Sequence, residues 1–168
     1  MKAARKSPAA PAKTGIAIGL TVEAGAWPPQ IELEAIARKA ADGVLAEVTP
    51  TGQAELSIIF SDDTRIKALN SGWRGKDKPT NVLSFPAFPH TGGKRLPPML
   101  GDVVLAAETV AREAAEEAKP LADHIAHLIV HGILHLIGYD HETDPEAEEM
   151  EATERRVLAR MGIPDPYR

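Results

Sequence analysis

The chain has 168 residues and a net charge of -5, with 43% hydrophobic and 26% charged residues. This length suits one domain around a single core, and no apolar run reaches the roughly 18 residues that a membrane span needs, so we expect a soluble protein. The chain has no cysteine, which excludes disulfides, leaves histidine and the carboxylates to bind any metal, and fits a reducing, cytoplasmic location.

Residues 1–15, MKAARKSPAAPAKTG, are rich in alanine, lysine and proline and contain no acidic side chain. They lack the apolar segment of a secretory signal, so we expect a disordered tail. A short organellar transit peptide has a similar composition and stays open as an alternative.

The rest of the chain, residues 16–168, is expected to form one domain. Alternating apolar residues and β-branched runs predict strands, whereas apolar residues at helical spacing, bounded by proline, glycine and capping residues, predict helices. In chain order we expect a strand at 16–22, a helix at 30–46, a strand at 55–60, a helix at about 62–73, strands at 82–85 and 101–106, and helices at 107–118, 121–137 and 144–161. Strands and helices do not alternate strictly. The expected fold class is therefore α+β, with about four strands in one mixed sheet packed by helices.

The charged residues are unevenly distributed along the chain. Residues 1–61 carry six basic and six acidic side chains, residues 62–100 carry seven and three, and residues 101–168 carry six and fifteen. The basic middle segment can provide an anion-binding face, although scattered, solvated charges are the more general explanation. Part of it, residues 74–100, contains five prolines and three glycines. Such a long irregular segment in a compact domain is usually functional or disordered.

Five of the six histidines lie between residues 124 and 141. His127, His131 and His135 are spaced by four, so they share one face of the expected helix. A lone histidine on an apolar helix is more often a core residue, but two spaced by four can bind one divalent ion. Gly138 is suited to end the helix in a left-handed conformation and to turn the chain so that His141 returns to the same place. Three imidazoles leave a fourth position open, which is typical of catalytic zinc sites.

Gly132 directly follows His131. Zinc peptidases of the H-E-x-x-H type have at this position a glutamate that transfers protons. Glycine cannot do this. The amide leaving group of a peptide needs that proton, whereas cleavage of a phosphodiester can depend more on stabilising charge in the transition state. The pattern favours a phosphodiester substrate. A zinc-dependent peptidase or amidohydrolase remains an alternative if another carboxylate lies near the open position.

The stretch HGILHLIGYDH, residues 131–141, resembles the signature H-G-x-L-H-L-x-G-Y-D-H of the endoribonuclease YbeY family of rRNA maturation factors. Residues 70–86, NSGWRGKDKPTNVLSFP, are similar to its block N-x-x-[YW]-R-x-x-D-x-P-T-D-V-L-S-F-P, and residues 101–103 resemble its Gly-Asp-Ile strand. The similarity extends from about residue 16 to 161. Asn81 is a departure, because the family usually has aspartate there, and this puts a carboxylate role at that position in doubt.

The resemblance implies a single-strand-specific endoribonuclease with one zinc ion per chain, acting in 3′-end maturation of small-subunit ribosomal RNA and in ribosome quality control. It implies His131, His135 and His141 as zinc ligands and Arg74 as the basic residue that faces the site. The implied partners are single-stranded ribosomal RNA, the small ribosomal subunit and its assembly proteins, with no membrane and no DNA. A non-catalytic ribosome-assembly factor, in which zinc stabilises the domain, is a further alternative.

The physical chemistry of Arg74 agrees with this role, because a guanidinium can donate two hydrogen bonds to a phosphate and stays charged. In the expected mechanism, zinc lowers the pKa of its water and positions it for attack at phosphorus, and Arg74 stabilises the developing charge. Asp102 and Asp140 can each accept a hydrogen bond from a ligand imidazole, although Asp140 can equally cap a turn. His127 can line the site or be buried and neutral.

Other residues are candidates for contacts with the substrate. Lys76 and Lys78, together with Lys94 and Arg95, can follow an RNA backbone. Trp73 or Phe85 can stack on a base, but core packing is the favoured role of Phe85.

Overall fold

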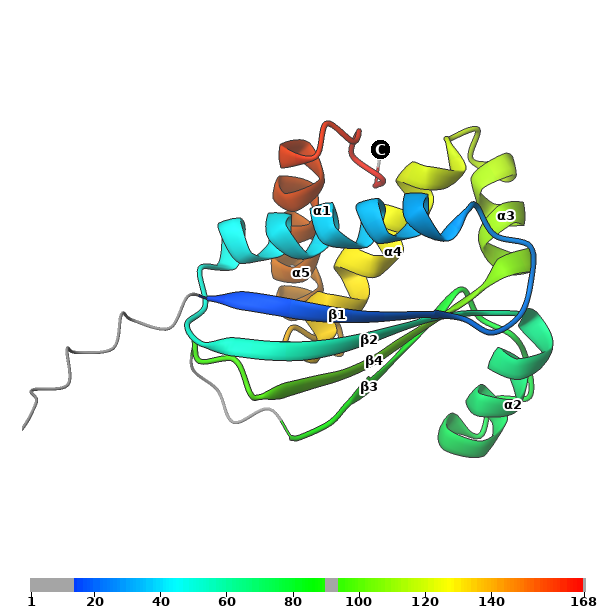
Figure 1. The fold of residues 1–168 in the computed structure, drawn as a ribbon, viewed down its shortest axis with the longest axis horizontal. Coiled ribbons are helices and arrows are strands. Elements are labelled where there is room, and N and C mark those ends of the chain that lie inside the picture. The colour runs from blue at the N-terminus through cyan, green and yellow to red at the C-terminus, as the bar shows by residue number, and fades with distance from the viewer. Residues whose placement is uncertain (1–13, 90–93, 168) are drawn as a thin grey trace, which may run out of the picture.

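The structure is a computed structural model that describes residues 14–89 and 94–167. Within these residues the chain forms four strands and five helices (Figure 1). They are β1 (Gly15–Val22), α1 (Gln30–Val48), β2 (Gln53–Ser61), α2 (Asp63–Arg74), β3 (Val82–Pro86), β4 (Met99–Ala106), α3 (Ala107–Glu116), α4 (Leu121–Leu136) and α5 (Asp144–Arg160). Each strand and helix expected from the sequence is present, which confirms the α+β class. Most of the expected tail, residues 1–13, lies outside the described residues, and Gly15 already belongs to β1.

The four strands form one mixed sheet in the order β1-β2-β4-β3. β1 pairs with β2 and β2 with β4 in parallel, whereas β3 pairs with β4 antiparallel. Parallel neighbours need a crossover connection, and α1 provides it between β1 and β2. Among the described residues β3 pairs only with β4, so it is an edge strand and its other side can border a site.

The main core lies between one face of the sheet and the helices α1, α4 and α5, which cover that face in Figure 1. Leu33 of α1, Ile58 of β2, Ile129 of α4 and Leu158 of α5 have no exposed surface. α4 is buried along most of its length, as its apolar sequence predicts. A smaller cluster on the opposite face packs α2 against β3 and β4. No helix among the described residues combines the length and apolar composition needed to cross a membrane.

Gly132 allows α4 to lie close to the sheet. A Cβ atom at this position would lie 2.8 Å from Cγ1 of Val103 on β4 and 3.2 Å from Oγ of Ser84 on β3. The Ser84 hydroxyl donates a hydrogen bond to the Gly132 carbonyl at 3.4 Å. Since Val103 is buried and β-branched, it has little freedom to move away. The position at which H-E-x-x-H peptidases carry glutamate is therefore packed against the sheet.

Candidate metal centre

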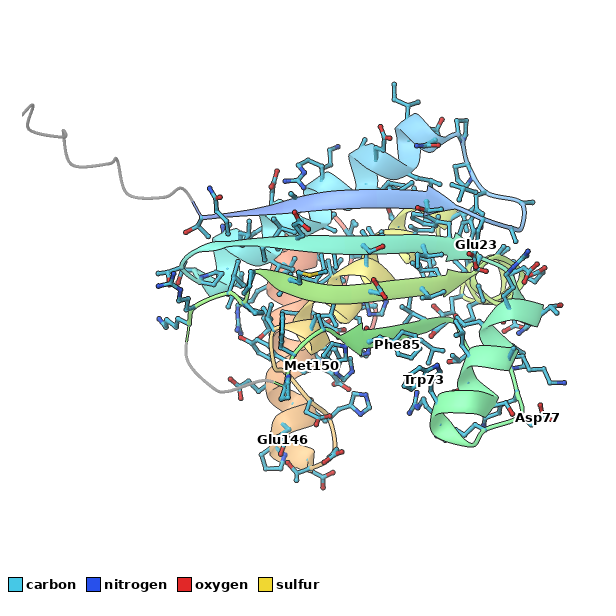
Figure 2. All side chains as sticks on the ribbon, turned by 60° about the horizontal axis from the view of Figure 1, so that its bottom comes forward. Glu23, Trp73, Asp77, Phe85, Glu146 and Met150 are labelled. Carbon is cyan, nitrogen blue, oxygen red and sulfur yellow. The ribbon has the colours of Figure 1, made fainter. Side chains whose placement is uncertain are left out.

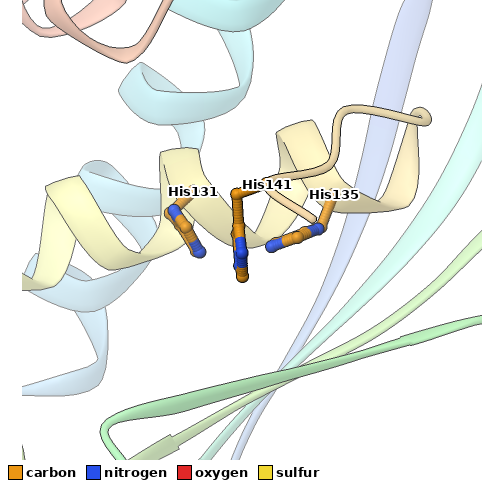
Figure 3. Close-up of side chains that lie close together, drawn as sticks. All are labelled: His131, His135 and His141. Carbon is orange, nitrogen blue, oxygen red and sulfur yellow. The ribbon is translucent and has the colours of Figure 1, made fainter. Parts of the chain in front are cut away.

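Three histidines converge where α4 ends (Figure 3). His131 and His135 lie one turn apart on the helix, and His141 lies in the segment that follows it. One ring nitrogen from each lies within 4.8 Å of the other two, so the three side chains can hold one metal ion between them. The structure thus brings together the three histidines that the family resemblance implies as ligands.

The chain reverses direction after α4 through a glycine turn. Gly138 has a φ of 110°, and Tyr139 donates its backbone N–H to the Leu134 carbonyl at 3.0 Å. The Asp140 carboxylate accepts the backbone N–H of His141 at 2.8 Å. Asp140 therefore caps the turn that carries His141, which is one of the two roles that the sequence left open. Next, Thr143 caps the start of α5 by accepting the N–H of Glu146.

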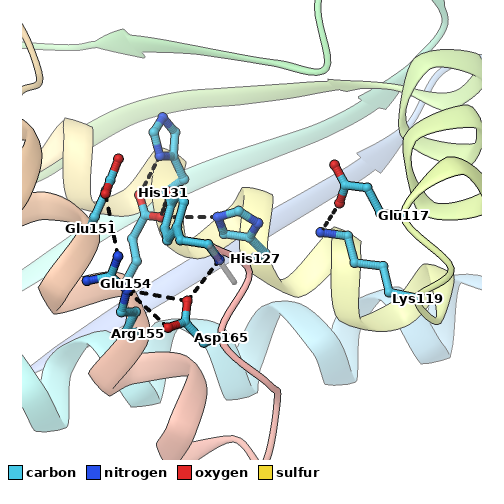
Figure 4. A network of polar contacts seen from close by, with 9 residues as sticks. Glu117, Lys119, His127, His131, Glu151, Glu154, Arg155 and Asp165 are labelled. Carbon is cyan, nitrogen blue, oxygen red and sulfur yellow. Dashed lines mark hydrogen bonds and ion pairs between the residues drawn. The ribbon is translucent and has the colours of Figure 1, made fainter.

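Glu154 of α5 holds the ring of His131 from behind (Figure 4). Its carboxylate is bonded to Nδ1 of His131 at 2.5 Å and to Nε2 of His127 at 3.1 Å, and it also accepts the hydroxyl of Tyr167. A carboxylate that accepts the Nδ1–H of a histidine fixes its tautomer and leaves Nε2 free to bind a metal. The sequence interpretation missed Glu154. The available signal was an acidic residue within the buried stripe of α5 that contains Met150 and Leu158.

His127 does not join the three candidate ligands, although it shares their helix face. Its side chain is 13% exposed and takes part in the site indirectly, because it shares the carboxylate of Glu154 with His131. His127 is partly buried and does not line the cavity beside the three candidate ligands.

The charges of the site favour metal binding. Burial, together with the neighbouring His131 and His141, lowers the pKa of His135 to about 4. His135 is therefore neutral near pH 7, and the neutral imidazole is the form that binds a metal. Burial raises the pKa of Glu154, but the hydrogen bonds from His127 and His131 outweigh this effect and bring it to about 2. Glu154 is consequently a carboxylate in the folded chain.

The histidines border a cavity of about 760 Å³, whose opposite side is formed by β3 and the end of α2. Arg74, the last residue of α2, lines this cavity. Lys76 and Lys78 lie exposed in the loop after α2, outside the lining. Lys94 and Arg95 line a separate cavity of about 440 Å³ on the other side of the Gly138 turn.

Two aromatic residues lie at the junction of α2 and β3 (Figure 2). The rings of Trp73 and Phe85 meet edge to face, with centroids 6.0 Å apart. Phe85 packs against the smaller hydrophobic cluster, in line with the core packing favoured from the sequence, and it also lines the cavity. Trp73 is 76% exposed and borders the cavity.

Asp102 is not brought to the histidines. Its neighbour Val103 faces α4, and successive side chains of a strand point to opposite faces. Asp102 is accordingly exposed on the outer face of the sheet, opposite Ser57 in the pairing of β4 with β2. This corrects the expectation that it accepts a hydrogen bond from a ligand imidazole.

Asn81, the departure from the family pattern, has a structural role. Its side-chain amide donates to both oxygens of Glu113, at 3.0 and 3.3 Å. Glu113 is also bonded to Nε2 of His124 on α4, at 3.1 Å. An amide suits this position, because an aspartate there would place a second carboxylate against Glu113.

The fold and the site define a class of small α+β proteins in which one buried helix and the turn after it present three histidines to a cavity. The family model of endoribonuclease YbeY matches residues 24–162. The chain therefore belongs to the endoribonuclease YbeY family, which confirms the resemblance found in its sequence.

Relatives match over most of their length. The chain is 54% identical over 156 residues to endoribonuclease YbeY of Allorhizobium ampelinum, covering 89% of this chain and 93% of the relative. It is 54% identical over 161 residues to endoribonuclease YbeY of Rhizobium meliloti, covering 92% of this chain and 96% of the relative. The solution structure of TM1509 from Thermotoga maritima is similar, with a TM-score of 0.54, 27% identity, and coverage of 88% of this chain and 91% of that one.

Proposed function

We propose that the protein is a zinc-dependent endoribonuclease that cuts single-stranded RNA in the maturation of ribosomal RNA. The observation that carries this proposal is the convergence of three histidines on a cavity that Arg74 also lines. Relatives that are 54% identical bear the name endoribonuclease, which supports RNA as the substrate.

Zinc suits the candidate ligands. His131, His135 and His141 would hold it through one nitrogen each, and imidazole nitrogen is a ligand that suits zinc. Bound in this way, zinc supplies Lewis acidity and lowers the pKa of a coordinated water to about 7. Glu154 holds His131 in the tautomer that this binding requires.

The chain's own residues complete the site. Arg74 would bind the phosphate and stabilise the negative charge that develops on its oxygens. Gly132 contributes no proton-transfer group, because its position is occupied by packing against Val103. The carboxylates that line the cavity belong to Asp140, which caps the turn, and to the exposed Glu142. Glu142→Gln therefore separates the proposal from a peptidase-like mechanism: we expect this variant to keep its RNA cleavage.

The cellular setting is part of the same proposal. We place the protein in the cytoplasm, acting on the 3′ end of small-subunit ribosomal RNA together with the small ribosomal subunit and its assembly proteins. Lys76 and Lys78 would contact phosphates next to the cavity, since they are exposed in the loop that directly follows Arg74.

The decisive experiment measures zinc content and cleavage of defined single-stranded and duplex RNA on the same preparations of wild type and His135→Ala. We expect wild type to bind one zinc ion per chain and to cut the single strand in preference to the duplex. His135→Ala should lose zinc and cleavage together. Cleavage by a zinc-free variant, or zinc-loaded wild type that cuts no RNA, would contradict the proposal.

A further inference from the structure

We propose that Glu154 and Tyr167 are positioning residues for the metal centre, so that the segment after α5 tunes how tightly the histidines bind zinc. This rests on the proposed binding of zinc and not on the proposed reaction with RNA. Neither residue touches the cavity that Arg74 lines. Both act through the ring of His131.

The carboxylate of Glu154 is held on both oxygens. It has no exposed surface, and a buried charge is stable only when hydrogen bonds satisfy it. Oε1 is bonded to Nδ1 of His131, whereas Oε2 is bonded to Nε2 of His127 and accepts the hydroxyl of Tyr167. The orientation of the His131 ring therefore depends on a carboxylate whose other oxygen is fixed by Tyr167.

Residues 161–167 are folded back to make this contact. Asp165 is paired with Arg155 of α5 at 3.2 Å and accepts the backbone N–H of Tyr167 at 2.8 Å. The guanidinium of Arg155 lies 5.3 Å from the centre of the Tyr167 ring, and the rings of Tyr167 and His127 meet edge to face with their centroids 5.7 Å apart. Tyr167 is thus anchored by its backbone, its ring and its hydroxyl.

The hydroxyl of Tyr167 acts as a permanent donor. Burial raises the pKa of Tyr167, and the hydrogen bond to Glu154 raises it further, so the group stays protonated at any physiological pH. Without it, Oε2 keeps the bond from His127 and loses one of its two donors. The carboxylate then has more rotational freedom, and the His131 ring is held less firmly in the orientation that leaves Nε2 free.

The test is the zinc dissociation constant, measured by competition with a chromophoric chelator for wild type, Glu154→Gln, Tyr167→Phe and the double variant. Loss of a hydrogen-bond partner behind a ligating histidine costs about 10- to 100-fold in metal affinity, which we expect for Glu154→Gln. For Tyr167→Phe, we expect a loss of about 3- to 10-fold, the equivalent of one hydrogen bond. The double variant should be no weaker than Glu154→Gln, because both changes act on one interaction.

Two matched controls separate positioning from general destabilisation. Glu113 also binds a histidine of α4 at 3.1 Å, but that histidine, His124, is not a candidate ligand. Thr153→Val removes a buried hydroxyl directly beside Glu154. We expect Glu113→Gln and Thr153→Val to retain wild-type zinc affinity even where they lower the melting temperature.

Unchanged zinc affinity in Tyr167→Phe would overturn the inference, as would an equal loss in Glu113→Gln and Glu154→Gln. Tyr167→Phe keeps the ring and its packing, so it provides the test even if Glu154→Gln does not fold. Since the readout is metal binding, the expected affinities would support the inference even in a protein that cuts no RNA. The proposed function and this inference can therefore fail separately.

Discussion

Arg74 and Trp73 end α2 side by side, and both border the cavity that the histidines share. Gly75 has a φ of 67° and stops the helix directly after them. Their side chains are therefore presented from the end of a regular helix, and their position beside the cavity depends on where that helix stops.

Arg74→Ala should lower the turnover of single-stranded RNA by about 10²- to 10³-fold, the usual cost of removing one group that stabilises transition-state charge. Zinc content should not change, because Arg74 is not a candidate ligand. Arg74→Lys should recover little, since an ammonium cannot make the paired hydrogen bonds of a guanidinium. Lys67→Ala, which removes a charge from the same helix outside the cavity lining, is the matched control. Normal turnover in Arg74→Ala would remove its catalytic role.

Trp73→Ala should raise the KM for single-stranded RNA with a smaller effect on kcat. An indole that is 76% exposed beside a cavity offers a stacking surface for an unpaired base, worth about 1–3 kcal/mol. Trp73→Phe should recover part of the loss. A substrate with one abasic nucleotide at the stacked position should bind wild type and Trp73→Ala equally. Ile31, also 76% exposed but on α1, gives the control variant Ile31→Ala. If an abasic scan finds no such position, stacking by Trp73 is excluded.

At the scale of the element, α4 combines two functions on neighbouring parts of its surface. One part carries the candidate ligands His131 and His135, and Gly132, about 100° further round the helix from His131, is pressed against the sheet. Any change that moves the helix away from the sheet also moves the ligands relative to the cavity. The packing of α4 and the geometry of the metal centre are therefore linked.

Gly132→Ala should destabilise the protein by about 1–3 kcal/mol, although alanine normally stabilises a helix relative to glycine. The reason is the contact of 2.8 Å that a new Cβ would make with Val103. Gly72→Ala in α2 is the control, because a Cβ there meets nothing within 4 Å and should stabilise by up to about 1 kcal/mol. Denaturant unfolding of both variants measures the difference. A stable Gly132→Ala would show that the close packing is not required.

Much of the fold could be predicted from local patterns, because caps and apolar periodicity depend on neighbouring residues. The candidate ligands also follow from a local pattern, since His131, His135 and His141 are close in sequence. The strand order could not be predicted, because pairing between β2 and β4 joins residues far apart. Alternation along β4 indicates that Asp102 and Val103 face opposite ways, but only the packing of α4 decides which of them faces the site. Glu154 was missed because only the packing of α5 against α4 brings its carboxylate to His131.

For the whole molecule, the buried titratable groups of the candidate metal centre make stability depend on pH. His135 has a pKa of about 4 in the folded chain and 6.5 ordinarily, so the unfolded chain binds more protons between these values. Its contribution to stability is complete above pH 6.5 and is lost as the pH falls towards 4. Glu154, with a pKa of about 2 against 4.5, adds a contribution that is lost as the pH falls from 4.5 towards 2.

The melting temperature of the zinc-free protein should therefore fall steadily from pH 6.5 to 4. His135→Gln should show a shallower fall over this window, because glutamine does not titrate. Ile31→Ala, an exposed change on α1 that removes no titrating group, should keep the slope of wild type. Equal slopes for wild type and His135→Gln would show that His135 is not the group responsible.

The three candidate ligands occupy one short stretch of chain, from His131 to His141. Histidines this close in sequence can still chelate zinc when the chain is unfolded, and a ligand that binds both states stabilises the native one less than its native affinity suggests. Glu154 and Tyr167 act on His131 only once α5 and the segment after it have folded. The rise in melting temperature on adding zinc should therefore measure how much more tightly zinc binds the folded chain than the unfolded chain. Glu154 and Tyr167 contribute to this difference. The rise does not measure the affinity of zinc for the folded chain alone.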